Sequence, residues 1–370
     1  MKRLVLAGGG HAHLETLLHL GAFVDAGAHV TVVSASDYQY YSGMGPGLLS
    51  GIYEPRQCRF DLRKMVEDRG GRFLCDPIVS LDGARRRLQL ASGERLAYDL
   101  LSVNLGSRVR FETASKTAFA AKPIEELMRA EALARSCLAK SPQARFVVAG
   151  GGAAGVELAG ALWRLGKQSG CRPDILLVAG SEMLSRAPQK LKDLARKSLQ
   201  ARGIGILEGC RVSEALEDRV RLDSGREIPS ELCLLATGVR PPELLAESGF
   251  PLGATGGLLV NSRLQVRDFP EVFGGGDCVD LEHAALPKVG VFAVRQNPVL
   301  RHNLMQSLKG EGKLKEFVPQ AAYLLILNMG DGRGIFWKKD RVYEGRLAFR
   351  LKDYIDRRFV EKYQVSGEQD

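Results

Sequence analysis

The stretch Leu4-Val5-Leu6-Ala7-Gly8-Gly9-Gly10-His11-Ala12-His13 decides how the rest of the chain is interpreted. Four apolar residues that end in a glycine cluster predict a short buried strand, and the leucine spacing of residues 13–20 predicts a helix after the turn. Gly8 permits a tight turn, Gly10 lets the backbone approach a pyrophosphate, and the helix N-terminus offers free N–H groups to phosphate oxygens. The stretch therefore predicts a dinucleotide site, with a glycine turn that binds no ligand as the alternative because His13 replaces the third glycine of the usual pattern.

The same pattern returns in the middle of the chain. Phe146-Val147-Val148-Ala149 is followed by Gly150-Gly151-Gly152-Ala153-Ala154-Gly155-Val156-Glu157 and a helix to about Leu165. All three glycines are present here: one for the turn, one for the phosphate and one for close packing of helix on strand. Each unit continues into a predicted hairpin and ends in an apolar strand with a glycine, at 100–107 and 232–238. Two such units in one chain predict an α/β protein that binds two dinucleotides.

The composition excludes several classes of protein. The seven cysteines are scattered, with no Cys-x-x-Cys or Cys-x4-Cys pair, which predicts a reducing, cytoplasmic setting without a disulfide framework or a local dithiol. No metal-ligand cluster is visible, so no metal is expected. No run approaches the ~18 apolar residues that a spanning helix needs. A length of 370 residues predicts two or three domains.

The net charge of +9 is concentrated near the end of the chain. Residues 333–362 contain ten basic and five acidic residues. Within them Leu347, Leu351, Ile355, Phe359 and Tyr363 recur every four residues, which predicts a basic amphipathic helix. Such a helix suits an anionic membrane surface, and packing against the rest of the protein or against a dimer partner is the alternative. Nucleic acid is not an expected partner, because no recognition motif accompanies the charge.

Four motifs in order carry a family resemblance. The two glycine loops, Ala236-Thr237-Gly238 and Gly275-Gly276-Asp277 resemble the FAD-dependent pyridine-nucleotide oxidoreductases, in which an NAD(P)H domain interrupts an FAD domain. Without a Cys-x4-Cys pair, the chain is similar to type II NADH dehydrogenase-like flavoproteins rather than to the disulfide reductases. The segments Tyr41-Ser42-Gly43-Met44, Lys122-Pro123 and 287–296 resemble most closely the branch associated with selenide, water dikinase.

The resemblance implies a fold and a division of the chain. We expect two tandem Rossmann-like domains, three-layer ββα folds that bind FAD and NAD(P)H, with a small C-terminal α+β domain. The first part of the FAD domain would cover 1–110, the NAD(P)H domain 111–238 and the second part of the FAD domain 239–310. Residues 311–370 would form an interface or membrane-docking region.

The resemblance also implies residues that bind FAD. Asp277 would accept hydrogen bonds from the ribityl or pyrophosphate side, and the helix after Lys288 would point its N-terminus at the flavin ring. His11 and His13 are expected to be neutral packing residues, because a helix N-terminus opposes a charged imidazole. The FAD-binding set is Gly8, Gly10, His11, Ala12, Ser34, Val79, Gly106, Gly276, Asp277, Lys288 and Val289.

For the nicotinamide nucleotide, the implied set is Gly150, Gly152, Ala154, Gly155, Glu157 and Gly238. The strand 175–178 ends at Ala179, where the family usually has an acid for the NAD ribose. Glu182 is the nearest carboxylate, whereas Arg186 would favour a 2′-phosphate, so the choice between NADH and NADPH stays open.

The implied catalytic set is Tyr41, Ser42, Met44, Lys122, Glu157 and Gln296. Tyr41 and Met44 would pack against a quinone ring, and Gln296 lies where quinone reductases carry a glutamine of their acceptor pocket. Glu157 is either a group near the nicotinamide or an ordinary first-turn acid. Lys122 either reaches the flavin or lies at the surface.

The expected activity is that of an FAD-dependent NAD(P)H:acceptor oxidoreductase that reduces a quinone or a similar small acceptor. One alternative is a flavoprotein that acts on sulfur or selenium species, and another is a redox sensor or scaffold with negligible turnover. The protein would be cytoplasmic or peripheral on the cytoplasmic membrane face. Its oligomeric state stays open.

Overall fold

Strand β1 (Lys2–Ala7) lies inside an eight-stranded sheet in the order β23-β20-β21-β22-β9-β1-β2-β5. It runs parallel to β2 and β9, and β9 runs parallel to β22, so strands from both ends of the chain share one sheet. The structure, a computed structural model, describes residues 1–109, 111, 113–310 and 312–365. The strands are β2 (Ala28–Ser34), β5 (Arg72–Cys75), β9 (Leu100–Val103), β20 (Leu258–Val260), β21 (Gln265–Val266), β22 (Phe269–Gly274) and β23 (Val279–Leu281).

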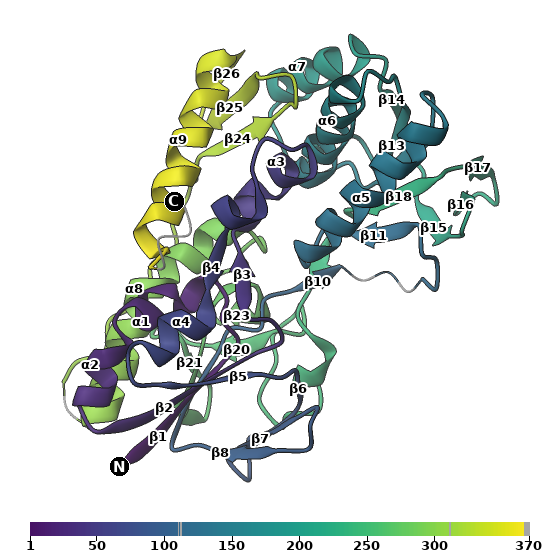
Figure 1. The fold of residues 1–370 in the computed structure, drawn as a ribbon. Coiled ribbons are helices and arrows are strands. Elements are labelled where there is room, and N and C mark those ends of the chain that lie inside the picture. Colours follow the sequence, from purple (N-terminus) through teal and green to yellow (C-terminus); the bar gives the residue numbers. More distant parts are fainter. Residues whose placement is uncertain (110, 112, 311, 366–370) are drawn as a thin grey trace.

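Helices and small sheets accompany the large sheet of this first lobe (Figure 1). The predicted helix at 13–20 begins two residues earlier, as η1 (His11–His13). It is divided into α1 and α2 at His19, whose φ of −111° and ψ of 25° are not helical. The helices are α1 (Leu14–Leu18), α2 (Leu20–Asp25), η2 (Ser42–Met44), α3 (Gly45–Leu49), η3 (Pro55–Cys58), α4 (Leu62–Glu67), η4 (Glu243–Leu245), η5 (Gly276–Cys278) and α8 (Gly290–Lys309). The small sheets are β3 (Tyr38–Tyr40) with β4 (Arg59–Asp61), and β6 (Ile78–Asp82) with β7 (Arg87–Leu90) and β8 (Arg95–Ala97).

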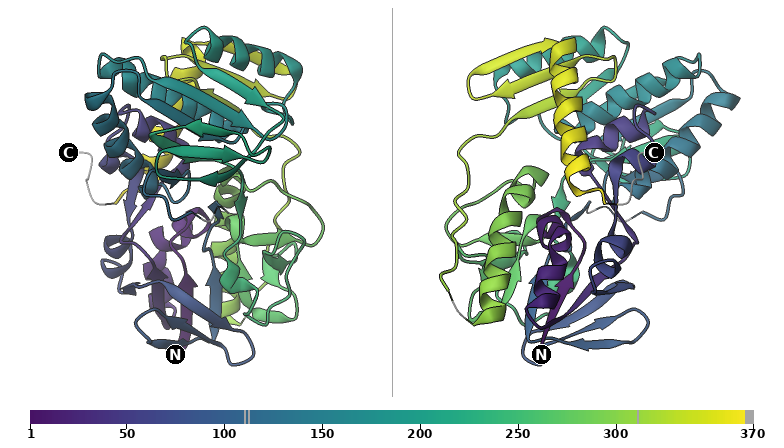
Figure 2. Two further views of the ribbon diagram at one scale, coloured as in Figure 1. Left: turned by 90° about the vertical axis from the view of Figure 1, so that its right-hand side faces the viewer. Right: turned by 60° about the vertical axis from the view of Figure 1, so that its left-hand side comes forward.

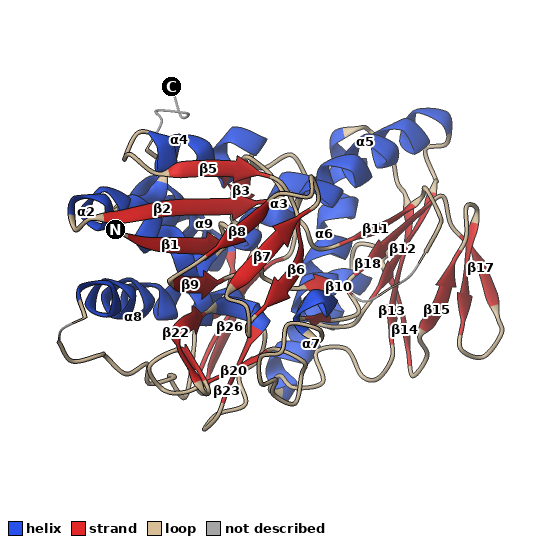
Figure 3. Ribbon diagram, turned by 90° about the horizontal axis from the view of Figure 1, so that it is seen from below, coloured by secondary structure: helices blue, strands red, loops and turns tan. Residues whose placement is uncertain are grey.

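The second lobe is built on a five-stranded parallel sheet in the order β11-β18-β12-β13-β14, with helices beside it (Figure 3). Both connections between the lobes pass through one antiparallel pair, β10 (Arg108–Val109) with β19 (Val239–Arg240). The strands are β11 (Ala118–Ala120), β12 (Arg145–Ala149), β13 (Asp174–Ala179), β14 (Gly205–Glu208) and β18 (Leu232–Leu235). The helices are α5 (Glu125–Lys140), α6 (Ala153–Gln168) and α7 (Gln189–Gln200).

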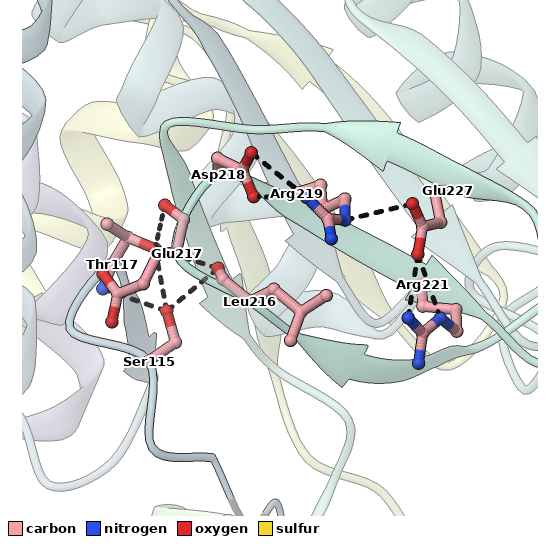
Figure 4. A network of polar contacts seen from close by, with 8 residues as sticks. All are labelled: Ser115, Thr117, Leu216, Glu217, Asp218, Arg219, Arg221 and Glu227. Atoms are coloured by element: carbon pink, nitrogen blue, oxygen red, sulfur yellow. Dashed lines mark hydrogen bonds and ion pairs between the residues drawn. The ribbon is translucent and has the colours of Figure 1, made fainter.

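A three-stranded antiparallel meander packs on the second lobe: β15 (Val212–Ala215), β16 (Arg219–Leu222) and β17 (Glu227–Pro229). Figure 4 shows how one end of it is fixed: Ser115 and Thr117 donate hydrogen bonds to the carbonyl of Leu216 at 2.9 and 3.2 Å. On the meander itself Arg219 pairs with Asp218 at 2.9 Å. Exposed ion pairs add little stability. The meander is held mainly by its buried apolar face, where Val220 and Leu222 belong to one core with Val147 of the second lobe, and the bonds to the Leu216 carbonyl fix its end.

The C-terminal unit is an antiparallel sheet, β24 (Leu325–Asn328), β25 (Gly334–Lys338) and β26 (Arg341–Gly345), followed by α9 (Arg346–Tyr363). The sheet lies beside α6 and α7 of the second lobe, and α9 runs from it to α1 of the first lobe (Figure 2). The predicted helix exists, but its apolar row does not face one environment. Phe359 and Tyr363 pack against Phe60, whereas Leu347, Leu351 and Ile355 are exposed.

Two features are absent from the described residues. None of their helices is long and apolar enough to cross a membrane. They also contain no group of three or more His, Cys, Asp or Glu side chains arranged to hold a metal ion.

Candidate functional site

The first glycine loop is shaped by the residue that follows β9. Gly8 has φ = +96°, and a Cβ there would lie 2.3 Å from the carbonyl oxygen of Asn104. A Cβ on Gly10 would lie 2.6 Å from Oδ1 of the same side chain. Both positions therefore need glycine: Gly8 for its backbone conformation as well as the close approach, and Gly10 for the approach of Asn104. The sequence identified the two glycines but not Asn104, because no local spacing links residues so far apart.

Two buried nitrogen atoms at this loop lack a partner among the described residues: Nε2 of His11 and Nδ2 of Asn104. The neighbouring ring of His13 is satisfied, with Nδ1 2.6 Å from the carbonyl of Gly8 and Nε2 2.7 Å from Oγ of Ser102. Burial lowers the pKa of both histidines to about 4, so they are neutral at pH 7. A buried unpaired polar atom costs about 1–3 kcal/mol, which a ligand with acceptor oxygens would recover. The loop thus fits the phosphate and hydroxyl groups of FAD.

The carboxylate of Asp277 lies on η5 near the same loop. Lys122 Nζ lies 2.8 Å from Oδ2, and Ser107 Oγ donates to the same oxygen at 2.7 Å, so Oδ1 has no partner among the described residues. Burial alone would raise the pKa of Asp277, but Lys122 and Ser107 outweigh it and hold the pKa below its usual value. Asp277 is therefore an ionised acceptor with one oxygen free, as a ribityl hydroxyl requires. Lys122 is not a surface lysine, since it reaches across to the FAD half.

Gln296 and Lys288 line a small cavity together with Gly276 and Asp277. Gln296 is buried, and its Oε1 accepts from the backbone N–H of Gly276 at 2.7 Å. This fixes the loop that carries Asp277. Lys288 instead pairs with Asp280 at 2.7 Å, so its ammonium is committed to another carboxylate.

The second glycine loop is open at the point where a phosphate would approach. Gly152 caps α6, and a Cβ there would meet nothing within 4 Å. A Cβ on Gly155 would lie 1.8 Å from the carbonyl oxygen of Gly150, and Gly150 itself has φ = +129°. Gly155 is thus required for the packing of helix on strand, and Gly152 leaves room for a phosphate to reach the backbone. The first N–H groups of α6 lie at that opening. The loop fits the pyrophosphate of NAD(P)H.

Helix α9 brings two charged side chains against the segment Tyr41–Gly43. Nζ of Lys352 lies 2.8 Å from Oδ2 of Asp356 and donates to the carbonyl of Gly43 at 2.8 Å. The hydroxyl of Tyr41 donates to Oδ1 of Asp356 at 3.3 Å. The sequence analysis missed this pair. The available signal was a Lys and an Asp four residues apart on the helix face opposite to the exposed leucines.

Glu157 belongs to the same cluster. Its Oε1 accepts from the backbone N–H of Asn328 at 2.8 Å, so it faces β24 and is not an exposed first-turn acid. Burial raises the pKa of Glu157 to about 7, against the attraction of Lys352, which lowers it. The carboxylates of Asp356 and Glu157 outweigh burial and raise the pKa of Lys352, which stays charged. Glu157 can therefore hold and release a proton near neutral pH.

Aromatic rings connect this cluster to the FAD loop. The ring of Tyr41 lies 5.6 Å from that of His11 and 4.6 Å from that of Phe359, measured between centroids. Met44, expected to contact an acceptor, is fully buried in the core, and Ser42 is only partly buried. The remaining expected residues are arranged as follows: Ala12 buried in η1, Ser34 at the end of β2, Val79 half-exposed on β6, Gly106 and Gly238 in left-handed turns, Ala154 exposed on α6 and Val289 capping α8.

Two glycine loops, each at the carboxyl ends of parallel strands in a separate sheet, define the class of protein: a two-dinucleotide oxidoreductase. Residues 2–304 match the family described as pyridine nucleotide-disulphide oxidoreductase, and the chain belongs to this family.

Curated relatives and solved structures agree with this assignment. Ferroptosis suppressor protein 1 of Homo sapiens is 28% identical over 293 residues, which cover 74% of this chain and 73% of the relative. Demethylphylloquinone reductase NdbB of Synechocystis is 25% identical and covers 83% and 80%. The fold is similar to that of the sulfide:quinone oxidoreductase from Aquifex aeolicus, with a TM-score of 0.82, 18% identity and coverage of 98% and 92%. It is also similar to NDH2 from Plasmodium falciparum, with a TM-score of 0.80, 14% identity and coverage of 97% and 96%.

Proposed function

We propose that the protein is an FAD-dependent oxidoreductase that takes a hydride from NAD(P)H and passes electrons to a quinone-type acceptor. Family membership and the two glycine loops support the two nucleotides. The observation that carries the acceptor is the buried cluster of Glu157, Lys352 and Asp356 beside Tyr41. Relatives whose names include a demethylphylloquinone reductase agree with it.

The cluster suits a quinone because quinol formation takes up two protons along with two electrons. Glu157, with a pKa of about 7, is half protonated at neutral pH and can supply one of them. Lys352 holds a positive charge that would stabilise an acceptor oxygen as it becomes negative. A disulfide of the protein itself is not the acceptor at this place, because the segment Tyr40–Pro46 contains no cysteine.

The residues that hold FAD divide by the part of the cofactor they suit. When bound, FAD supplies the hydride-accepting and electron-donating chemistry. Gly8, Gly10, His11 and Ala12 would hold the pyrophosphate, Asp277 would accept from a ribityl hydroxyl, and the N-terminus of α8 after Val289 would lie toward the flavin ring. Lys122 and Gln296 position Asp277 through the contacts described above. Gly150, Gly152, Ala154, Gly155 and Gly238 hold the nicotinamide nucleotide.

The alternative that the protein acts on sulfur species is weakened by the buried state of Cys278, the cysteine next to Asp277. Cys278 is fully buried, and its Sγ donates to the carbonyl of Gly275 at 3.3 Å. Burial raises the pKa of its thiol to about 11, so the nucleophilic thiolate is scarce at neutral pH. Membership of the branch associated with selenide, water dikinase rests on sequence segments alone.

The proposal keeps the division into 1–110, 111–238, 239–310 and 311–370, which agrees with the strands that share each sheet. It also includes peripheral contact with the cytoplasmic membrane face. Leu347, Leu351, Tyr354 and Ile355 are exposed along α9, with arginines on the same helix. An apolar strip with basic flanks suits an anionic lipid surface.

Anaerobic stopped-flow mixing tests the proposed function. The FAD-loaded protein should lose flavin absorbance rapidly when mixed with NADH or NADPH, and a soluble quinone should restore the absorbance faster than oxygen does. No bleaching with either nucleotide would favour the sensor interpretation. Bleaching without acceleration by quinone would remove the assigned acceptor.

A further inference from the structure

The carboxyl end of β13 is where a Rossmann domain binds the adenosine ribose, and here the strand ends in Ala179 instead of an acid. Ala179 packs against the glycine loop, since a Cβ on Gly151 would lie 2.5 Å from its Cβ. The two nearest acids, Glu182 and Glu208, each form an ion pair. Glu182 pairs with Lys192 at 2.5 Å, and Glu208 pairs with Arg196 at 2.8 Å. The ribose hydroxyls of NAD normally take an acid at this position, so the usual NAD contact is missing.

An arginine lies in that place instead. Cγ and Nε of Arg211 would both be 2.8 Å from a Cβ on Gly180, the first residue after β13. The side chain of Arg211 therefore lies over the strand end, next to Gly180. The Arg211 guanidinium has no carboxylate partner among the described residues, and the residue is exposed.

The backbone of Arg211 is held from two sides. Its N–H donates to Oδ1 of Asp223 at 3.2 Å, and its carbonyl accepts from the N–H of Asp223 at 2.8 Å. The backbone N–H of the preceding residue, Cys210, donates to the carbonyl of Ala179 at 3.3 Å. Asp223 belongs to the turn of the meander that Figure 4 shows anchored at its other end. The position of Arg211 is thus built into the fold.

We propose that Arg211, with the hydroxyl of Ser181 beside Gly180, binds the 2′-phosphate of NADPH, so that the protein prefers NADPH to NADH. This rests on the proposed function, which needs a nicotinamide nucleotide at the second glycine loop. A guanidinium matches two phosphate oxygens at once, and a phosphate gains nothing from a neighbouring carboxylate. Arg186, exposed in the same loop, is a second cation within the segment that follows β13.

Calorimetric titration of the FAD-loaded protein tests the assignment without turnover. The probes are 2′,5′-ADP and 5′-AMP, which differ only by the 2′-phosphate. In the wild type 2′,5′-ADP should bind at least ~10-fold more tightly, and Arg211→Gln should bring the two affinities together. The matched control is Arg172→Gln, which removes an exposed arginine at the opposite, amino end of β13 and should keep the preference.

The following results would overturn the preference for NADPH or the role of Arg211. Equal affinities in the wild type, or no measurable binding of 2′,5′-ADP, overturn the inference. A preference that survives Arg211→Gln overturns the role of Arg211. 5′-AMP lacks the 2′-phosphate, so its affinity should be the same in Arg211→Gln and in the wild type. A changed 5′-AMP affinity would show that the substitution disturbs the whole site, and would count against the role of Arg211. Rapid flavin bleaching by NADH at least as efficient as that by NADPH would overturn this inference alone, whereas no bleaching by either would overturn the proposed function.

Discussion

Glu157 shows how one residue can connect stability with chemistry. Its carboxyl group is held against β24 and close to Lys352, and burial raises its pKa from 4.5 to about 7. The folded protein therefore binds a proton there between pH 4.5 and 7 that the unfolded chain has released. The contribution of Glu157 to stability falls as pH rises through this window, by up to about 3 kcal/mol.

The variant Glu157→Gln should remove that fall. His11 and His13, whose pKa values are lowered, act in the opposite sense between pH 4 and 6.5, so the informative quantity is the difference between variant and wild type. Measured by denaturant unfolding, the variant should gain stability relative to the wild type between pH 5 and pH 8. The exposed Glu316→Gln should show no such gain. A constant difference for Glu157→Gln across the range would contradict the raised pKa.

At the scale of elements, the junction of β12 and α6 separates two kinds of glycine. Gly155 is needed for packing, because a Cβ would lie 1.8 Å from a backbone oxygen that cannot move aside, whereas the space at Gly152 is open. Gly155→Ala should therefore destabilise the fold by at least about 1–3 kcal/mol. Gly152→Ala should keep the stability of the wild type and weaken nucleotide binding.

Thermal unfolding and nucleotide titration of the two FAD-loaded variants check this pair. A lower Tm confined to Gly155→Ala, with a weaker affinity in Gly152→Ala, is the expected result. Equal Tm values for Gly155→Ala and wild type would mean that the helix can shift away from the strand.

The elements that the sequence predicted well are those with a local pattern. Both strand–turn–helix units, the hairpins and the C-terminal helix follow from apolar spacing and glycine positions within a few residues. Lys352, Asp356 and Asn104 were missed because their partners come from distant segments, and only tertiary packing brings them together. The row of α9 was wrongly taken as one face, since Phe359 and Tyr363 are covered while Leu351 is not.

For the whole molecule, the exposed apolar residues of α9 form the surface that is proposed to contact a membrane. Replacing Leu347, Leu351 and Ile355 together by Ser should reduce co-sedimentation with vesicles that contain phosphatidylglycerol by at least ~10-fold, because each buried leucine contributes about 1.5–3 kcal/mol. Flavin content and reduction by nicotinamide nucleotide should be unchanged. Wild-type protein that stays in the supernatant with anionic and neutral vesicles alike would contradict a membrane contact.

The paired strands β10 and β19 have a mechanical consequence for the molecule. Because the two crossings hydrogen-bond to each other, a substitution that breaks this pairing acts on both connections at once. Helix α9 forms a further link, since its contacts run from β24 of the C-terminal unit to α1 of the first lobe. The spacing between the two nucleotide loops therefore depends on contacts made by three separate parts of the chain.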